Sequence, residues 1–204
     1  MTFKSLRILS AALVAASLLL AGCKDTPGSG PTAKAASTPV SIAAIAADAK
    51  GFTVGAPMST RTVYVFFDPQ CPHCNELWKA AKPLKSQAKF VWIPVGLINP
   101  SSTAQGATLL AAANPITVME EHEVSMDAKR GGISAGSDIE AQKAVVAKNT
   151  ALFTSFGFSS VPSLVGTHAQ TGALVTREGA MPTAALASVL GLQAPVDAAG
   201  ALPK

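Results

Sequence analysis

The sequence predicts an α/β fold in which a block of helices is inserted between the second and third strands. Two segments rich in β-branched and aromatic residues, 61–67 and 89–95, predict buried strands on either side of one helix. Residues 97–160 then change to helical patterns separated by polar, glycine-rich loops. Two short strands and a last helix follow, so the predicted order is β, α, β, helical block, β, β, α.

Residues 1–22 are predicted to be a lipoprotein signal peptide rather than part of this fold. Lys4 and Arg7 precede an uncharged apolar run, and small residues then lead to Cys23. The run is shorter than the ~20 residues that a membrane-spanning helix needs. Its end, the tetrapeptide LAGC at 20–23, resembles the lipobox of bacterial lipoproteins, which implies cleavage before Cys23 and lipid on its sulfur. The alternative is a plain secretory signal followed by a chance cysteine.

The residues that precede the domain indicate where in the cell the protein is expected. Lys24 stands where an Asp would retain an enteric lipoprotein at the inner membrane, so we expect lipid anchoring in the periplasm, with the outer membrane favoured. Residues 23–40 are rich in Pro, Gly, Ser, Thr and Ala and predict a flexible tether. The domain itself is expected at 41–193, before a loose tail at 194–204. Removing the signal peptide lowers the formal net charge from +4 to +2, too little to indicate nucleic-acid binding.

Proline and glycine positions divide the first half of the domain. Gly51 ends a short helical stretch, and Pro72 suits the first turn of a helix because its missing N–H would be unpaired there anyway. Pro83 should kink or end that helix. The predicted elements are a short helix within 40–51, a strand at 61–67, a helix at 71–87 and a strand at 89–95.

The helical insertion is expected at about residues 100–157. Asn114–Pro115 separates its first two helices, and Gly157 ends its third. His122 is expected on the solvated face of the second helix, and His168 in a turn. The predicted elements are helices at 103–113, 115–124 and 138–157, strands at 163–167 and 173–179, and a last helix at 182–192. This order is that of the thioredoxin fold with extra helices before the last two strands.

The CPHC motif supplies the candidate chemistry. Cys71 lies at the start of a predicted helix, where backbone N–H groups and the helix dipole favour negative charge and lower a thiol pKa. The resulting thiolate is the nucleophile of disulfide exchange, and Cys74 lies one turn further on. His73 can add a positive charge or a hydrogen-bond donor near Cys71. If Cys23 carries lipid, Cys71 and Cys74 are the even pair that remains in an exported protein.

The cysteine pair could also be a structural disulfide or part of a metal site. A structural disulfide that closes so short a loop stabilises a fold only slightly. A metal site needs further ligands, and only His122 and His168 remain besides His73. We therefore expect no metal and no cofactor other than the redox-active disulfide Cys71–Cys74.

Three segments resemble the DsbC/DsbG family of periplasmic thiol:disulfide interchange proteins, and its DsbG branch most. They are FFDPQCPHCNELW, VGLINPSSTAQGATLLAAANP and NTALFTSFGFSSVPSLV, and the resemblance extends over roughly residues 42–192. It implies a thioredoxin-like fold with a helical insertion before the cis-proline strand, and disulfide isomerase or reductase activity. It also implies that Cys71 is the nucleophile, that Cys74 resolves the mixed disulfide, and that Pro162 is a cis-proline whose loop, with Val161, docks substrate.

The chain departs from this family in three ways. Val161 stands where DsbC and DsbG have threonine and DsbA has valine. The dipeptide Pro72-His73 is that of DsbA, whereas DsbG has Pro-Tyr. Both changes favour a more oxidising pair. The segment between Cys23 and the domain is also too short for the family's dimerisation domain, so we expect a monomer.

Three functions remain open on the sequence alone. The first is an isomerase or reductase that acts on disulfides or sulfenylated cysteines of exported proteins and is kept reduced by a DsbD-like membrane electron donor. The second is a DsbA-like oxidase that is kept oxidised by a DsbB-like acceptor. The third is a non-catalytic binding module that uses the cis-proline groove.

Overall fold

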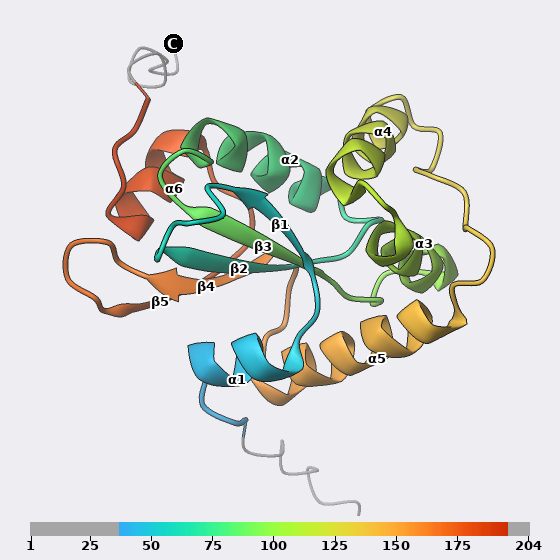
Figure 1. The fold of residues 1–204 in the computed structure, drawn as a ribbon, viewed down its shortest axis with the longest axis horizontal. Helices are drawn as coiled ribbons and strands as arrows, with labels where there is room; N and C mark the ends of the chain where they lie inside the picture. The colour runs from blue at the N-terminus through green and yellow to red at the C-terminus, as the bar shows by residue number, and fades with distance from the viewer. Residues whose placement is uncertain (1–36, 196–204) are drawn as a thin grey trace, which may run out of the picture. The chain divides into compact units, whose positions relative to one another are not determined.

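The computed structural model describes residues 37–195, which form a mixed five-stranded sheet covered by helices (Figure 1). The sheet order is β1-β3-β2-β4-β5, in which β2 and β3 run parallel and the other neighbouring pairs are antiparallel. The strands are β1 Phe52–Gly55, β2 Thr62–Phe67, β3 Lys89–Pro94, β4 Ser163–Thr167 and β5 Leu174–Glu178. The predicted α/β class and thioredoxin-like fold are confirmed.

Helices cover both faces of the sheet. In Figure 1, α2 and α6 lie on one face, α1 and α5 lie on the other, and α3 and α4 stand at the end of the sheet where β2 and β3 finish. The helices are α1 Ile42–Asp48, α2 Pro72–Ala81, α3 Pro100–Ala111, α4 Pro115–Asp127, α5 Glu140–Ser155 and α6 Thr183–Leu190, with a short 3-10 helix at Lys82–Leu84. The predicted helical insertion consists of three helices, α3 to α5, which lie between β3 and β4.

Alternation along β2 explains the two-sided core. Val65 and Phe67 face the side of α2, where Phe67 meets Trp92 edge-on at 5.6 Å between ring centroids. Phe66 faces the opposite side and packs on Phe153 of α5 at 5.9 Å. The strand is therefore buried on both faces, which is why the sequence carries an unbroken run of β-branched and aromatic residues here.

The sequence missed one strand and placed one helix end too early. The edge strand β1, Phe52–Gly55, pairs antiparallel with β3 directly after the helix predicted to end at Gly51. Its four residues are too few to show an alternating pattern. The helix predicted at 115–124 continues to Asp127 in the structure. Pro83 acts as expected, because α2 gives way at Lys82 to the 3-10 helix.

The signal peptide, Cys23, most of the tether and most of the tail lie outside the described residues. Within residues 37–195, no helix combines the length and the apolar character needed to cross a membrane.

Candidate active site

The two cysteines follow directly from the carboxyl end of β2. Residues Asp68 to Cys71 form a tight turn in which the Cys71 N–H donates to the Asp68 carbonyl at 3.0 Å. The Asp68 carboxylate closes the turn by accepting from the Gln70 N–H at 2.8 Å. Its other oxygen accepts from the N–H groups of Leu97 and Ile98 at 2.7 and 3.0 Å. This fully buried side chain therefore ties the loop after β2 to the loop after β3.

Cys71 is the N-cap residue of α2, with extended backbone angles of φ −93° and ψ 114°, and Pro72 occupies the first turn. A hydrogen bond from the Cys74 thiol lowers the pKa of Cys71 to about 7, against the opposing effect of burial. The backbone N–H groups of Cys74 and His73 lower it further. Since the first N–H groups of a helix have no partner within the helix, a sulfur anion at the N-cap satisfies them.

Cys74 has the opposite electrostatic environment. It is 1% exposed, and burial raises its pKa well above the ordinary value, aided by the nearby Cys71 sulfur. Cys71 is 6% exposed, and both side chains are free thiols in this structure. Near neutral pH a thiolate therefore forms at Cys71 and not at Cys74.

His73 turns away from the sulfur and toward the solvent. Its Nδ1 lies 3.0 Å from the Glu76 carboxylate, and the hydrogen bond that it donates to Glu76 raises the pKa of His73. The charge of the ring contributes the smallest of the effects that lower the pKa of Cys71, whereas the His73 backbone N–H contributes more. Of the two parts of His73, the backbone N–H therefore has the larger effect on Cys71, and the charge of the ring has the smaller one.

The second wall of the site comes from the loop before β4. The Val161–Pro162 peptide bond is cis, the geometry that the family resemblance implies. The Val161 carbonyl lies 3.4 Å from Cys71 Sγ, which donates to it in the thiol form. One carboxylate oxygen of Glu178 holds this loop by accepting from the N–H and hydroxyl groups of Ser159 and Ser160. Residues ninety positions apart in sequence thus meet at the same sulfur.

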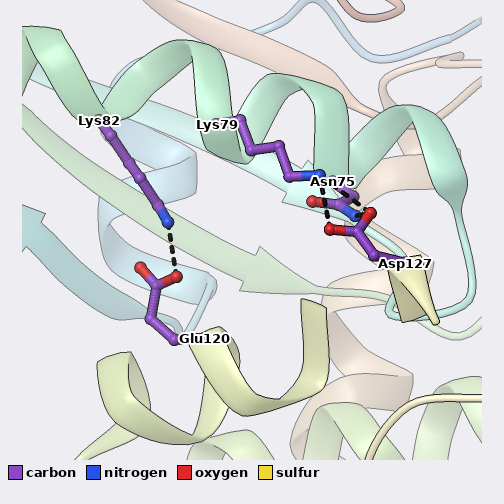
Figure 2. Close-up of polar contacts among 5 residues, drawn as sticks. All are labelled: Asn75, Lys79, Lys82, Glu120 and Asp127. Carbon is purple, nitrogen blue, oxygen red and sulfur yellow. Dashed lines mark hydrogen bonds and ion pairs between the residues drawn. The ribbon is translucent and has the colours of Figure 1, made fainter. Parts of the chain in front are cut away.

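Helix α2 is tied to the insertion by charged side chains. Figure 2 shows Lys79 on α2 reaching Asp127 on α4. It also shows Lys82, the first residue of the 3-10 helix that follows α2, reaching Glu120 on α4. Asn75 donates to the same Asp127 carboxylate at 2.7 Å. These partly exposed ion pairs contribute little individually to stability, but they set how the two helices face each other.

Glu123 lies on the same face of α4, between Glu120 and Asp127. It is 5% exposed, and burial together with the charge of Asp127 raises its pKa to about 8. Lys79 of α2 and Lys82 of the following 3-10 helix thus face three acids of α4, of which Glu123 is largely neutral at neutral pH.

The expectation that His122 faces solvent is wrong. Its side chain is fully buried, with Nε2 2.7 Å from the Pro69 carbonyl and Nδ1 accepting from the Ile133 N–H at 3.2 Å. Burial lowers the pKa of His122. The flanking acids in MEEHEV suggested a solvated face, but the insertion folds back over this part of α4. His168 lies in the turn between β4 and β5, as expected.

A hollow of about 490 Å³ opens beside α2, next to the turn that carries His73. It lies between α2 and the segment that joins β5 to α6. The lining residues are Glu76, Lys79, Ala80, Ala180, Met181, Pro182 and Thr183. In the part of the chain that the structure describes, no three metal-ligating side chains come together.

Comparison with known proteins gives the same picture. Residues 55–194 match the thioredoxin-like domain family. The chain is 32% identical to thiol:disulfide interchange protein DsbG of Pseudomonas aeruginosa over 134 residues, which cover 64% of this chain and 51% of the relative. It is also 32% identical to DsbG of Escherichia coli over 104 residues, 50% of this chain and 42% of that protein. The chain therefore spans about half the length of these curated relatives.

A solved structure shares the fold. The chain superposes on a periplasmic thioredoxin-like protein from Salmonella enterica serovar Typhimurium with a TM-score of 0.52, covering 69% of this chain and 88% of that chain. Sequence identity is 17%, so this likeness concerns the fold alone.

Proposed function

The chain belongs to the thioredoxin-like domain family, and from that premise we propose that it is a periplasmic, DsbG-like thiol:disulfide oxidoreductase that reduces or reshuffles disulfides of exported proteins. The observation that carries the proposal is the asymmetry of the cysteine pair. Cys71 has a pKa of about 7 at a helix N-terminus, and Cys74 is buried with a strongly raised pKa. This division suits one attacking thiolate and one protonated reserve thiol.

The exchange reaction can be written from these two sulfurs. The Cys71 thiolate attacks one sulfur of a client disulfide, an S–S bond forms between protein and client, and the second client sulfur leaves as a thiolate that takes up a proton. Cys74 then loses its proton and attacks Cys71 Sγ, which releases the remaining client sulfur and closes the Cys71–Cys74 disulfide. Two electrons pass from the protein to the client in reduction. In isomerisation a client thiol resolves the mixed disulfide instead, and the pair stays reduced.

Client docking follows from the surroundings of Cys71. The Val161–Pro162 segment presents backbone groups beside the sulfur, and the hollow along α2 can take client side chains. An electron donor at the membrane, DsbD-like in its chemistry, would return the pair to the dithiol after each reduction.

The reverse direction is the second candidate. A lowered pKa at Cys71 stabilises the dithiol relative to the disulfide, which makes the disulfide a stronger oxidant. The Pro72-His73 dipeptide favours the same direction. In that case the chain donates its disulfide to exported proteins, and a DsbB-like acceptor reoxidises it.

The location belongs to the same proposal. The signal peptide at 1–22 would direct export before it is removed. The lipid on Cys23 would then hold a monomer at the periplasmic side of a membrane, the outer membrane in the favoured case. The DsbG relatives support export.

Trapping thiols in growing cells separates the two directions. We expect acid quenching followed by alkylation with a mass-shifting maleimide to show Cys71 and Cys74 mostly reduced, because an isomerase or reductase must attack as a thiolate. A Cys71→Ser, Cys74→Ser double variant sets the position of the unlabelled band. A pair found mostly oxidised would exclude the isomerase or reductase and leave the oxidase.

A further inference from the structure

The loop that precedes the nucleophile is held by the helical insertion as well as by the thioredoxin-like core. The carbonyl of Pro69 contacts Nε2 of His122 on α4 at 2.7 Å, across 53 residues of sequence. The Gln70 side chain donates to Gln105 of α3 at 2.6 Å and to the Gly131 carbonyl at 2.9 Å. Two consecutive residues before Cys71 are thus bound by three parts of the insertion.

The hydrogen bonds of His122 define its protonation state. Nδ1 accepts from the Ile133 N–H at 3.2 Å, so this nitrogen carries no proton. Nε2 must then carry the proton of the neutral ring and donate it to the Pro69 carbonyl. Burial lowers the pKa of His122, which keeps the ring neutral. His122 is therefore a fixed bridge between the loop before Cys71 and the segment after α4.

The segment after α4, residues 131–133, lies directly against the His122 ring. Gly132 has a φ of +87°, and a Cβ placed on it would lie 2.4 Å from His122 Cε1 and 2.9 Å from Gln105 Nε2. Gln105 Nε2 donates to the carbonyls on both sides, those of Gly131 at 2.7 Å and Ile133 at 2.8 Å. A side chain at 132 would push the ring from its place, so the glycine allows the close approach.

We propose that His122 is a positioning residue of the exchange site, which fixes the Pro69 carbonyl and so holds Cys71 in its N-cap conformation at the start of α2. This inference rests on the proposed function only for its consequence for catalysis. The sulfur of Cys71 meets the N–H groups of His73 and Cys74 only while Cys71 keeps extended backbone angles. A loop released at Pro69 lets Cys71 rotate, and the thiolate then loses these donors.

Two variants that differ by one methylene group test this role. His122→Gln keeps an N–H donor that reaches as far as Nε2, whereas His122→Asn keeps only a group at the place of Nδ1, which can still accept from Ile133. The thiolate absorbance of the reduced protein near 240 nm gives the pKa of Cys71. We expect His122→Asn to raise this pKa by about one unit, which lowers the thiolate fraction at pH 7 by about fivefold. We expect His122→Gln to stay close to the wild type.

Asn149 provides the matched control for simple destabilisation. It is equally buried, and it binds the N–H and carbonyl of Lys50 and the Pro94 carbonyl from α5, away from the cysteine loop. Asn149→Leu should lower the melting temperature without changing the pKa of Cys71.

The results that would overturn the positioning role of His122 differ from those that would overturn the proposed function. A wild-type pKa in a folded His122→Asn protein overturns the positioning role, as does an equal rise in Asn149→Leu. If His122→Asn does not fold, Gln105→Leu and Gln70→Ala decide together. Both variants lose the Gln70–Gln105 contact, but only Gln105→Leu also removes the bonds from Gln105 to the carbonyls of Gly131 and Ile133, the residues that lie against the His122 ring. A larger rise of the Cys71 pKa in Gln105→Leu supports the role, and equal values in the two variants overturn it. A wild-type protein with a low Cys71 pKa but no disulfide exchange overturns the proposed function alone.

Discussion

Replacing Cys71 with serine is expected to abolish disulfide exchange, lowering the rate of insulin disulfide reduction on the order of a thousandfold or more. A serine hydroxyl is not ionised near neutral pH, so the N–H groups at the start of α2 have no anion to stabilise. The fold should remain intact, because the polar contacts of Cys71 Sγ are a 3.4 Å contact with the Val161 carbonyl and a hydrogen bond with the Cys74 thiol. Far-UV circular dichroism and the melting temperature check this condition.

Cys74→Ser is the matched control for the same assay. It should also stop turnover, but it leaves the attacking thiolate in place, so a mixed disulfide with the client should accumulate and appear on a non-reducing gel. The assignment of Cys71 as the nucleophile fails if Cys71→Ser keeps activity, or if the adduct accumulates in Cys71→Ser instead of in Cys74→Ser.

Replacing Glu123 with glutamine should remove a pH dependence of stability. The folded-state pKa of Glu123 is about 8, above its ordinary value of 4.5, so the folded state holds this proton more tightly than the unfolded chain. The stabilising contribution of protonated Glu123 is therefore fully present below pH 4.5, its pKa in the unfolded chain. This contribution is lost as the pH rises toward 8, its pKa in the folded state. Between pH 4.5 and 8 the loss amounts to on the order of 4 kcal/mol. Above pH 8 the glutamine variant should be more stable than the wild type by about this amount.

Glu120→Gln is the control for that prediction. Glu120 lies on the same face of α4 but pairs with Lys82 near the surface, so its loss should cost less than about 1 kcal/mol. Urea unfolding from pH 5 to 9 gives the free energies. Parallel pH curves for Glu123→Gln and the wild type would contradict the assignment of a buried, protonated Glu123.

The features that the sequence predicted well depend on local signals. The strand predicted at 61–67 and the start of the helix opened by Pro72 follow from residue type and proline placement, and both occur within one residue of the prediction. The end of that helix, predicted at 87, comes earlier, at Ala81. The position of Cys71 at a helix N-terminus follows from the same local pattern. The cis peptide bond before Pro162 was expected only from the family resemblance, because few X–Pro bonds in folded proteins are cis.

The features that it missed depend on contacts across the chain. His122 and Pro69 are 53 residues apart, and nothing near MEEHEV shows that this part of α4 is covered. Glu123 has the polar neighbours of a solvated helix face, yet it is only 5% exposed in the folded chain. Asp68 precedes the motif as an ordinary turn residue, and its bonds to Leu97 and Ile98 exist only once β2 and β3 are paired. Single-sequence patterns carry no information on such pairings.

The pH dependence of alkylation measures directly whether Cys71 ionises near neutral pH while Cys74 stays protonated. The reduced protein is mixed with iodoacetamide between pH 4 and 10, and mass spectrometry of peptides gives a separate rate for each cysteine. We predict that Cys71 reacts with a midpoint near pH 7 and that Cys74 stays unreactive over this range. Equal reactivity of the two thiols, or a Cys71 midpoint near the ordinary thiol value of 9.0, would contradict the account.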